Sequence, residues 1–463
     1  MKPLLLRLLT LAAALVFTTS FTPFILIAQA QDARPPLTVP YRMFKLDNGL
    51  NVILHQDRSV PVVAVNVWYH VGSANEKPGR TGFAHLFEHL MFEGSGNVEE
   101  GAFDTLLEAA GGTNNGSTTN DRTNYYEDIP SSALELALFL ESDRMGYLLQ
   151  DMDAARVDGQ RNVVKNERRQ SIENAPYGMA YLEFDKMIFP EGHPYHWPVI
   201  GYMEDLTAAS HQDVVDFFKK YYAPNNASIV IAGDIDLDQT QALVQKWFGE
   251  IPKGAPVEKV TARQPALPSV MRKTMTDRVQ LPRLMLGWVG TKSFSPDEAA
   301  IEVAMSVLAG GKNSRLYKRL VYDMQIAQDV SAYQQAMALS GSITIMATPK
   351  PGKTVAEIQK VIDEELQKLR TTPPDAREVQ RAINQIEASF YRQMERVGSY
   401  RGKAEQLNAY YFATGEPNYF AKDLARFTSL TPADIQKAII QWLPADKRVE
   451  LIVEPEKKSE KTQ

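Results

Sequence analysis

Residues 81–95, TGFAHLFEHLMFEGS, place two histidines and a glutamate within one turn of a predicted helix. At 3.6 residues per turn, His85 and His89 project from the same helix face, so two imidazole nitrogens can converge on one ion. The apolar residues of the stretch bury the rest of the helix and leave the histidines toward a cleft. The pattern therefore predicts a metal site carried by a helix.

Glu88 is next to His89 in sequence but is rotated away from the direction in which the histidines project. Catalytic zinc has three protein ligands and a water, and the pKa of that water falls to about 7. A carboxylate beside the water can remove its proton, so Glu88 is the candidate general base. The alternative is an ordinary packed helix in which two buried histidines bond to backbone carbonyls.

A charged helix is predicted over residues 154–174, AARVDGQRNVVKNERRQSIEN, and Glu167 on it is the natural third ligand. A third zinc ligand commonly comes from a different element that faces the site. Spacing alone does not choose among the acidic residues, and an exposed glutamate beside arginines is usually solvated. The competing carboxylates are Glu127, Asp128, Glu141 and Glu173.

The composition of the 463 residues is that of a globular protein, with 44% hydrophobic and 23% charged residues, enough for about two to four domains. The net charge of −6 gives no electrostatic reason to expect a nucleic acid as partner. No cysteine occurs in the sequence. Any zinc must therefore be held by histidine, aspartate or glutamate.

Residues 1–30 have the pattern of a secretory signal peptide. Lys2 and Arg7 precede an apolar run, and the segment ends in Ala-Gln-Ala, which predicts cleavage before Gln31. We therefore expect a periplasmic protein. Pro23 interrupts the apolar run, but an uncleaved membrane anchor remains the alternative.

Residues 111–130, GGTNNGSTTNDRTNYYEDIP, are rich in glycine, asparagine and threonine, which is typical of a hairpin with tight turns. A polar strand over residues 112–118 can form a sheet edge whose free N–H and C=O groups accept an extended peptide. The alternative is a solvated hairpin without such a role.

The chain repeats a capped helix followed by a strand. Ser210-x-x-Asp213 precedes VVDFFKKYY and the strand SIVIAGDID, and Thr431-x-x-Asp434 precedes IQKAIIQWL and the strand VELIVEP. The offset of about 221 residues indicates two similar domains.

We expect the first domain over residues 41–250, a linker over 251–269 and the second domain over 270–457. Four prolines and mixed charge mark the linker. All seven histidines precede it, so a single metal site belongs to the first domain.

Ordered blocks from residue 41 to residue 455 resemble the pitrilysin family of zinc metallopeptidases, which includes insulin-degrading enzyme and the mitochondrial processing peptidase. The blocks are NGLNVIL, GFAHLFEHLMFEGS, AGGTNNGSTTNDRTNYY, VVKNERRQ, HPYHWPVIG, YYAPNNASIVIAGDID and AGGKNSRLYKRL. His-x-x-Glu-His is the motif order named inverzincin. The resemblance implies that His85, His89 and Glu167 bind one zinc ion per chain and that Glu88 is the base of an endopeptidase.

The resemblance also implies an α+β fold of two homologous domains, each an antiparallel sheet backed by helices, which together form one half of a clam-shell. The substrate-binding edge strand of the family corresponds to Gly112, Thr113, Asn114 and Asn115. One departure is Gln160, where many members carry a glutamate two helical turns before the third ligand. An amide there can hydrogen-bond but contributes no charge.

The chain is long enough for only one half of the clam-shell, so a second subunit is expected to close a chamber around short, unfolded peptides. Family members often hold substrate with an arginine and a tyrosine seven residues apart, where this chain has Val321 and Gln328. A heterodimer with a homologous subunit that carries the Arg/Tyr pair is therefore expected. The alternatives are a homodimer and a catalytically silent structural subunit.

Overall fold

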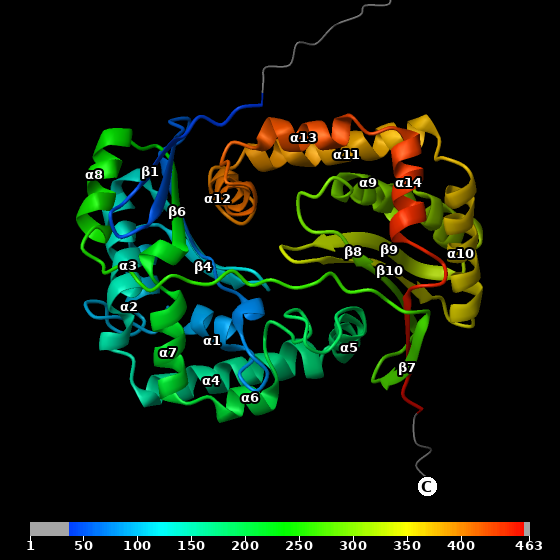
Figure 1. The fold of residues 1–463 in the computed structure, drawn as a ribbon, viewed down its shortest axis with the longest axis horizontal. Coiled ribbons are helices and arrows are strands. Elements are labelled where there is room, and N and C mark those ends of the chain that lie inside the picture. Colours follow the sequence, from blue (N-terminus) through cyan, green and yellow to red (C-terminus); the bar gives the residue numbers. More distant parts are fainter. Residues whose placement is uncertain (1–36, 458–463) are drawn as a thin grey trace, which may run out of the picture. The chain divides into compact units, whose positions relative to one another are not determined.

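Two β-sheets organise the chain, one before residue 234 and one after residue 270 (Figure 1). The computed structural model describes residues 37–457. The first sheet consists, in order, of β1 (Arg42–Lys45), β2 (Asn51–Gln56), β6 (Ala227–Gly233), β3 (Val62–Tyr69), β5 (Thr123–Pro130) and β4 (Thr113–Thr118). The second consists of β7 (Met271–Asp277), β11 (Val449–Pro455), β8 (Arg283–Gly290), β10 (Gly341–Pro349) and β9 (Ala327–Ala336).

The two sheets share one connectivity once β1 is set aside. In each, the first strand pairs in parallel with the last, as β2 does with β6 and β7 with β11, and the remaining pairs are antiparallel. The last strand of each sheet follows a helix that begins with the predicted capping box, at Ser210 and at Thr431. The internal repeat read from the sequence is thus present in the structure.

Helices cover the first sheet and fill one core against it. The helices of this half are α1 (Phe83–Leu90), α2 (Ala102–Ala109), α3 (Leu134–Tyr147), α4 (Ala154–Arg168), α5 (Gly178–Ile188), α6 (Met203–Ala208), α7 (His211–Tyr221) and α8 (Leu237–Phe248). The helix predicted over 154–174 changes to a π-helical turn, Arg169–Glu173, after α4.

The second sheet has its own helices and its own core. These helices are α9 (Glu298–Ala309), α10 (Val355–Thr371), α11 (Ala376–Met394), α12 (Lys403–Thr414), α13 (Phe420–Thr428) and α14 (Pro432–Trp442). Residues 251–270 between the halves contain no helix or strand. The α+β fold expected from the sequence is confirmed, whereas the exact domain limits stay a prediction.

The halves exchange one helix each. In α5, Phe184 and Ile188 pack against the second sheet in a cluster with Met285 and Leu451. In α12, Asn408 hydrogen-bonds to the first sheet at Asn66 and Ser228. Because α12 covers the face away from the first core, β3 is buried on both faces, in keeping with its nearly continuous apolar sequence.

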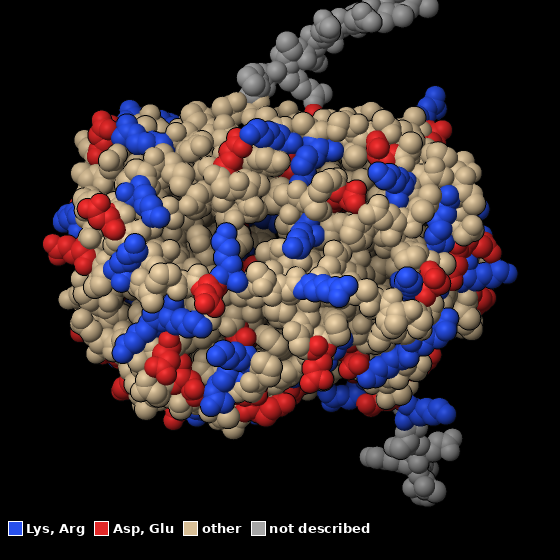
Figure 2. All heavy atoms as spheres, viewed as in Figure 1, with Lys and Arg blue, Asp and Glu red and all other residues tan. Residues whose placement is uncertain are grey.

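No helix within residues 37–457 combines the length and apolar character needed to cross a membrane. The predicted signal peptide, residues 1–30, lies outside the described residues. Figure 2 shows lysine and arginine interspersed with aspartate and glutamate over one face of the molecule.

Candidate metal centre and its pocket

Helix α1 holds both histidines on one face. It begins after Gly82, whose φ is +86° and at which a Cβ atom would lie 2.8 Å from the Ile200 carbonyl oxygen. Leu86 and Phe87 are buried in the first core, and the rings of His85 and His89 lie 4.9 Å apart on the other side of the helix. The alternation of apolar and polar positions thus turns the histidines away from the core.

Glu167 meets this histidine pair from the end of α4. Its Oε2 lies 3.7 Å from Nε2 of His85 and 3.3 Å from Nε2 of His89. The three candidate ligand atoms lie within 4.8 Å of one another, and among the described residues this is the one such group of three or more. That these residues bind zinc stays a prediction.

The donor set fits zinc. Nitrogen and oxygen ligands about 2.0–2.2 Å from one tetrahedral ion lie roughly 3.3–3.6 Å from each other, close to the two distances found here. Burial, followed by the neighbouring His89, lowers the pKa of His85 to about 4. The hydrogen bond from His89 lowers the pKa of Glu167. A neutral imidazole and an ionised carboxylate are the forms that ligate a metal.

The competing carboxylates have other partners. Glu127 and Glu141 are fully buried and both pair with Arg144. Asp128 accepts hydrogen bonds from Ser399, and Glu173 pairs with Arg168. These contacts are the physical reason why Glu167, and none of the four alternatives, faces the histidines.

The side chain of Glu88, on α1, contacts the edge strand β4. Thr118 Oγ1 donates a 2.6 Å hydrogen bond to Glu88 Oε2. A Cβ atom at Gly116 would lie 2.9 Å from Glu88 Cγ, so a glycine lets the strand approach the glutamate. Burial raises the pKa of Glu88. Gly116 and Thr118 were not among the predicted site residues, although the expected strand contained them.

The predicted substrate-binding residues lie at the start of this edge strand. Gly112 directly precedes β4, and Thr113, Asn114 and Asn115 form its first half. β4 pairs with β5 on one side only, so its outer side is a free sheet edge. Asn114 donates a hydrogen bond to Asp104 of α2, whereas Thr113 and Asn115 are exposed.

Gln160 lies on α4 two turns before Glu167, as predicted, but it contacts neither histidine in a hydrogen bond. Its amide donates a 2.5 Å hydrogen bond to Oε1 of Glu93, which follows α1. Gln160 thus joins α4 to the end of the segment that carries the histidines. Val321 packs partly buried against the second core, and Gln328 is exposed near the start of β9.

A pocket of about 480 Å³ opens beside the cluster and includes His85, Glu88 and Glu167 in its lining. Its lining comes from both halves of the chain: Trp197 lies in the segment after α5, Gln335 near the end of β9 and Met337 directly after β9. In the sequence, the block HPYHWPVIG is recognisable only as a family motif. No local pattern predicts that it forms a wall of this pocket.

Hydrogen bonds fix this wall between the halves. Tyr195 donates a 2.6 Å hydrogen bond to Oδ1 of Asp121 and accepts one from the Leu339 backbone N–H. The other oxygen of Asp121 accepts from the Ala338 backbone N–H at 3.0 Å. Trp197 donates its indole N–H to the Ser73 carbonyl. The pocket is therefore a built cavity and not a gap between loosely packed halves.

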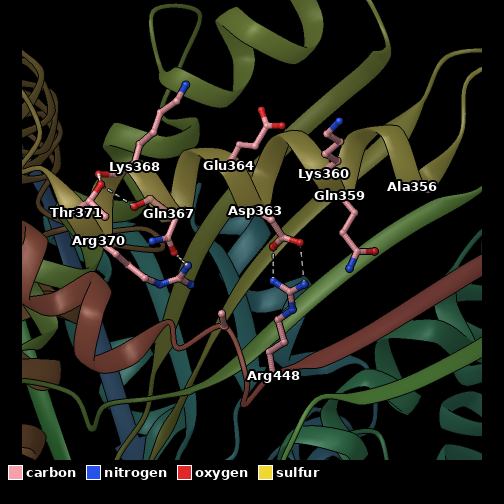
Figure 3. A pocket seen from close by; sticks show the side chains of 11 residues that line it. Ala356, Gln359, Lys360, Asp363, Glu364, Gln367, Lys368, Arg370, Thr371 and Arg448 are labelled. Atoms are coloured by element: carbon pink, nitrogen blue, oxygen red, sulfur yellow. Dashed lines mark hydrogen bonds and ion pairs between the residues drawn. The ribbon is translucent and has the colours of Figure 1, made fainter.

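A larger groove of about 940 Å³ runs along α10, far from the histidines in sequence and fold (Figure 3). Arg448 in it forms an ion pair with Asp363 and a second with Glu450. Lys368 pairs with Glu365. The charges named here already have partners within the fold, so size alone does not make this groove the candidate site.

Comparison with known proteins shows which family the chain belongs to. The family model described as Insulinase (Peptidase family M16) matches residues 51–181, and the one described as Peptidase M16 inactive domain matches residues 208–386. The zinc protease PqqE of Helicobacter pylori is 30% identical over 332 residues, 70% of this chain and 73% of that protein. The chain belongs to the M16 peptidase family. His85, Glu88, His89 and Glu167 all fall in the part that matches the Insulinase model.

Other M16 relatives extend the match. An uncharacterized zinc protease of Streptomyces coelicolor is 27% identical over 408 residues, 85% of each chain. The crystal structure of a protease from Helicobacter pylori superimposes with a TM-score of 0.84 at 26% identity, covering 90% of this chain and all of that one. The resemblance expected from the sequence blocks is thus confirmed at the level of family and two-domain fold.

Proposed function

We propose that this chain is a zinc-dependent endopeptidase that holds one zinc ion per chain through His85, His89 and Glu167. The observation that carries the proposal is the convergence of these three side chains beside Glu88 and a free sheet edge. The name "zinc protease" borne by several relatives supports it.

The residues around the cluster have distinct tasks. When bound, zinc polarises the peptide carbonyl and lowers the pKa of water. Thr118 occupies Oε2 of Glu88, which leaves Oε1 to accept the proton from the attacking water. The same carboxyl group then delivers this proton to the nitrogen of the departing amine.

The edge strand β4 aligns the substrate in this proposal. An extended peptide adds to the free side of β4 through backbone hydrogen bonds, which suit any sequence. Gly112, Thr113, Asn114 and Asn115 then lie along one end of the peptide, and the bond to be cleaved lies near Gly116 and Glu88. A backbone held in this way brings the carbonyl to a fixed position, which lowers the entropic part of the barrier.

The substrates we propose are short, unfolded peptides in a chamber closed by a second subunit. Val321 and Gln328, where family members often have arginine and tyrosine, support a homologous partner that supplies this pair. A homodimer is the alternative. We also propose the domain limits 41–250 and 270–457, and export to the periplasm by residues 1–30. N-terminal sequencing of the exported chain tests the proposed export.

A catalytically silent structural subunit is the second candidate function. Its support is the description "inactive domain" of the model that matches residues 208–386, which lies outside the histidine cluster. The two candidates differ in whether Glu88 is needed for a measurable activity.

Metal analysis and the variant Glu88→Gln test the proposed function. We expect about one zinc per chain in both proteins, because the amide removes the base but no ligand. With the homologous partner subunit present, we expect hydrolysis of unfolded peptides to fall roughly 100- to 10,000-fold in the variant. Glu108→Gln, an exposed position on α2, is the matched control and keeps normal activity. Near-normal hydrolysis by Glu88→Gln, or a chain that binds no zinc, contradicts the proposal.

A further inference from the structure

The carboxylate of Asp185 lines the pocket, and none of the proposed hydrolytic steps uses it. It lies on α5 and lines the pocket together with His85 and Glu88. Among the described residues, none forms a hydrogen bond or an ion pair with its side chain. Its neighbour on the helix, Glu183, is by contrast paired with Lys273 at 2.7 Å.

The surroundings of Asp185 are unusual for an unpaired acid. Asp185 has an exposed surface and lines the pocket, but many protein atoms surround its carboxyl group, and this crowding raises its pKa to about 7. A carboxylate at the wall of a pocket has fewer water molecules around it than one on an open surface. A cation that enters the pocket gives the ionised carboxylate of Asp185 a favourable partner.

The composition of the pocket favours a cation with an apolar stem. Its lining contains no lysine or arginine, and Asp185 is its one carboxylate apart from the proposed zinc ligand Glu167 and the base Glu88. Its walls include Leu182, Phe189, Trp197 and Met337. Lysine and arginine side chains combine a chain of methylene groups with a charged head, so they match both properties. A volume of about 480 Å³ accommodates one such side chain.

The pocket is next to the reacting groups. His85, Glu88, Ser117 and Thr118 belong to its lining, and Thr118 is the residue that holds Glu88. A peptide that lies along β4 with its scissile bond at Glu88 therefore places a side chain adjacent to that bond in the pocket.

We propose that Asp185 determines specificity by selecting a lysine or arginine side chain next to the cleaved bond. This inference rests on the proposed peptidase function. The carboxylate of Asp185 accepts hydrogen bonds from the ammonium or guanidinium group, and the pocket walls enclose the methylene stem.

Paired peptides test the proposal with the chain in the assembly that hydrolyses peptides. Lysine is compared with norleucine, and arginine with citrulline, at each position flanking the cleaved bond. We expect kcat/KM to favour the cationic member about 10- to 100-fold at one position, as a charge-assisted hydrogen bond implies. In Asp185→Asn this ratio falls to about one, and in Asp185→Lys a glutamate peptide becomes preferred over its lysine counterpart.

A binding measurement separates the two proposals. Fluorescence anisotropy of the same labelled peptides on Glu88→Gln, with and without Asp185→Asn, reports selection when no bond is cut. Peptide cleavage without cationic preference in either measurement overturns the role of Asp185 and leaves the peptidase proposal standing. Cationic preference in binding, with no cleavage by the wild-type chain even when a homologous subunit that carries the Arg/Tyr pair is present, supports cation selection by Asp185 and overturns the peptidase proposal. Failure of both measurements overturns both.

Glu183→Gln is the matched control, because it removes a carboxylate from the same helix outside the pocket. It should retain the full cationic preference. If Glu183→Gln lost that preference, the selection of cationic side chains would depend on the charge of α5 as a whole. That result would contradict a specific role of Asp185.

Discussion

At the scale of single residues, the hydrogen bond between Thr118 and Glu88 connects the edge strand to the helix that carries both histidines. Glu88 has no other hydrogen bond to a described side chain. The orientation of its carboxyl group therefore depends on the same strand along which we propose that the peptide lies. A base positioned by the substrate-binding strand keeps its distance to the bound peptide constant.

We predict that Thr118→Val lowers kcat about tenfold while KM changes less than about twofold, because the valine has the same shape but donates no hydrogen bond. Thr118→Ser should restore most of kcat, since its hydroxyl can donate to Oε2. Steady-state kinetics with an unfolded peptide measures both values. Full kcat in the valine variant, or a serine variant as slow as the valine one, would refute the positioning role. Zinc content should not change in either variant.

At the scale of elements, α5 joins the two halves. Its sequence lies in the first half, but a Cβ atom at Gly287 of β8 would lie 2.5 Å from the ring of Phe184. Phe184 and Ile188 are buried against the second sheet, while Asp185 on another face lines the pocket. Packing of the apolar face thus fixes the position of the pocket-lining face.

We expect Phe184→Ala to lower the free energy of unfolding by about 3–5 kcal/mol, the usual cost of removing a buried aromatic ring. Urea unfolding followed by circular dichroism measures the change. Met179→Ala on the same helix, at a position 40% exposed, should cost less than about 1 kcal/mol. A loss below about 1 kcal/mol in Phe184→Ala would mean that α5 is not anchored on the second sheet in solution.

At the scale of the whole molecule, contacts between the halves include an ion pair between Asp57, directly after β2, and Lys403, the first residue of α12. Both side chains are mostly shielded from solvent. The hydrogen bond from Lys403, followed by that from Ser59, lowers the pKa of Asp57 below its ordinary value.

This shift makes a prediction about acid stability. Since folding depresses the pKa of Asp57, the pair contributes its full stability above the unfolded pKa, about 4, and loses it as the pH falls through the depressed folded value. Lys403→Met should therefore destabilise the protein at pH 7 but progressively less below about pH 4. Unfolding curves of both proteins from pH 7 to pH 3 test this. A stability difference that stays constant or grows on acidification contradicts the assignment.

A further prediction concerns assembly. We expect the chain purified alone to be nearly inactive, because it lacks a chamber wall and the Arg/Tyr pair that orient the peptide. Addition of a homologous subunit that carries the pair should restore cleavage of short peptides, while folded proteins should resist. Size measurement combined with peptide assays checks this. A fully active homodimer of this chain would refute the half-enzyme proposal and support the alternative.

The sequence by itself determined the features that depend on neighbours along the chain. The spacing of His85 and His89 sets their common helix face because the α-helix has a fixed period. The capping boxes at Ser210 and Thr431 set two helix starts because each box is closed by residues three positions apart. Both features, and the repeat that the boxes revealed, are present in the structure.

Only the tertiary structure decided which distant groups meet. Local periodicity does not say which surface an apolar face will cover, so nothing in the sequence placed α5 on the second sheet or α12 on the first. The approach of Glu167 to the two histidines, the hydrogen bond from Thr118 to Glu88 and the pocket lined by Asp185 have the same origin. Each depends on packing between segments that are far apart in the chain. Which residues are buried there depends on how the shapes of two packed faces fit together, and the spacing of residues within a single segment does not determine it.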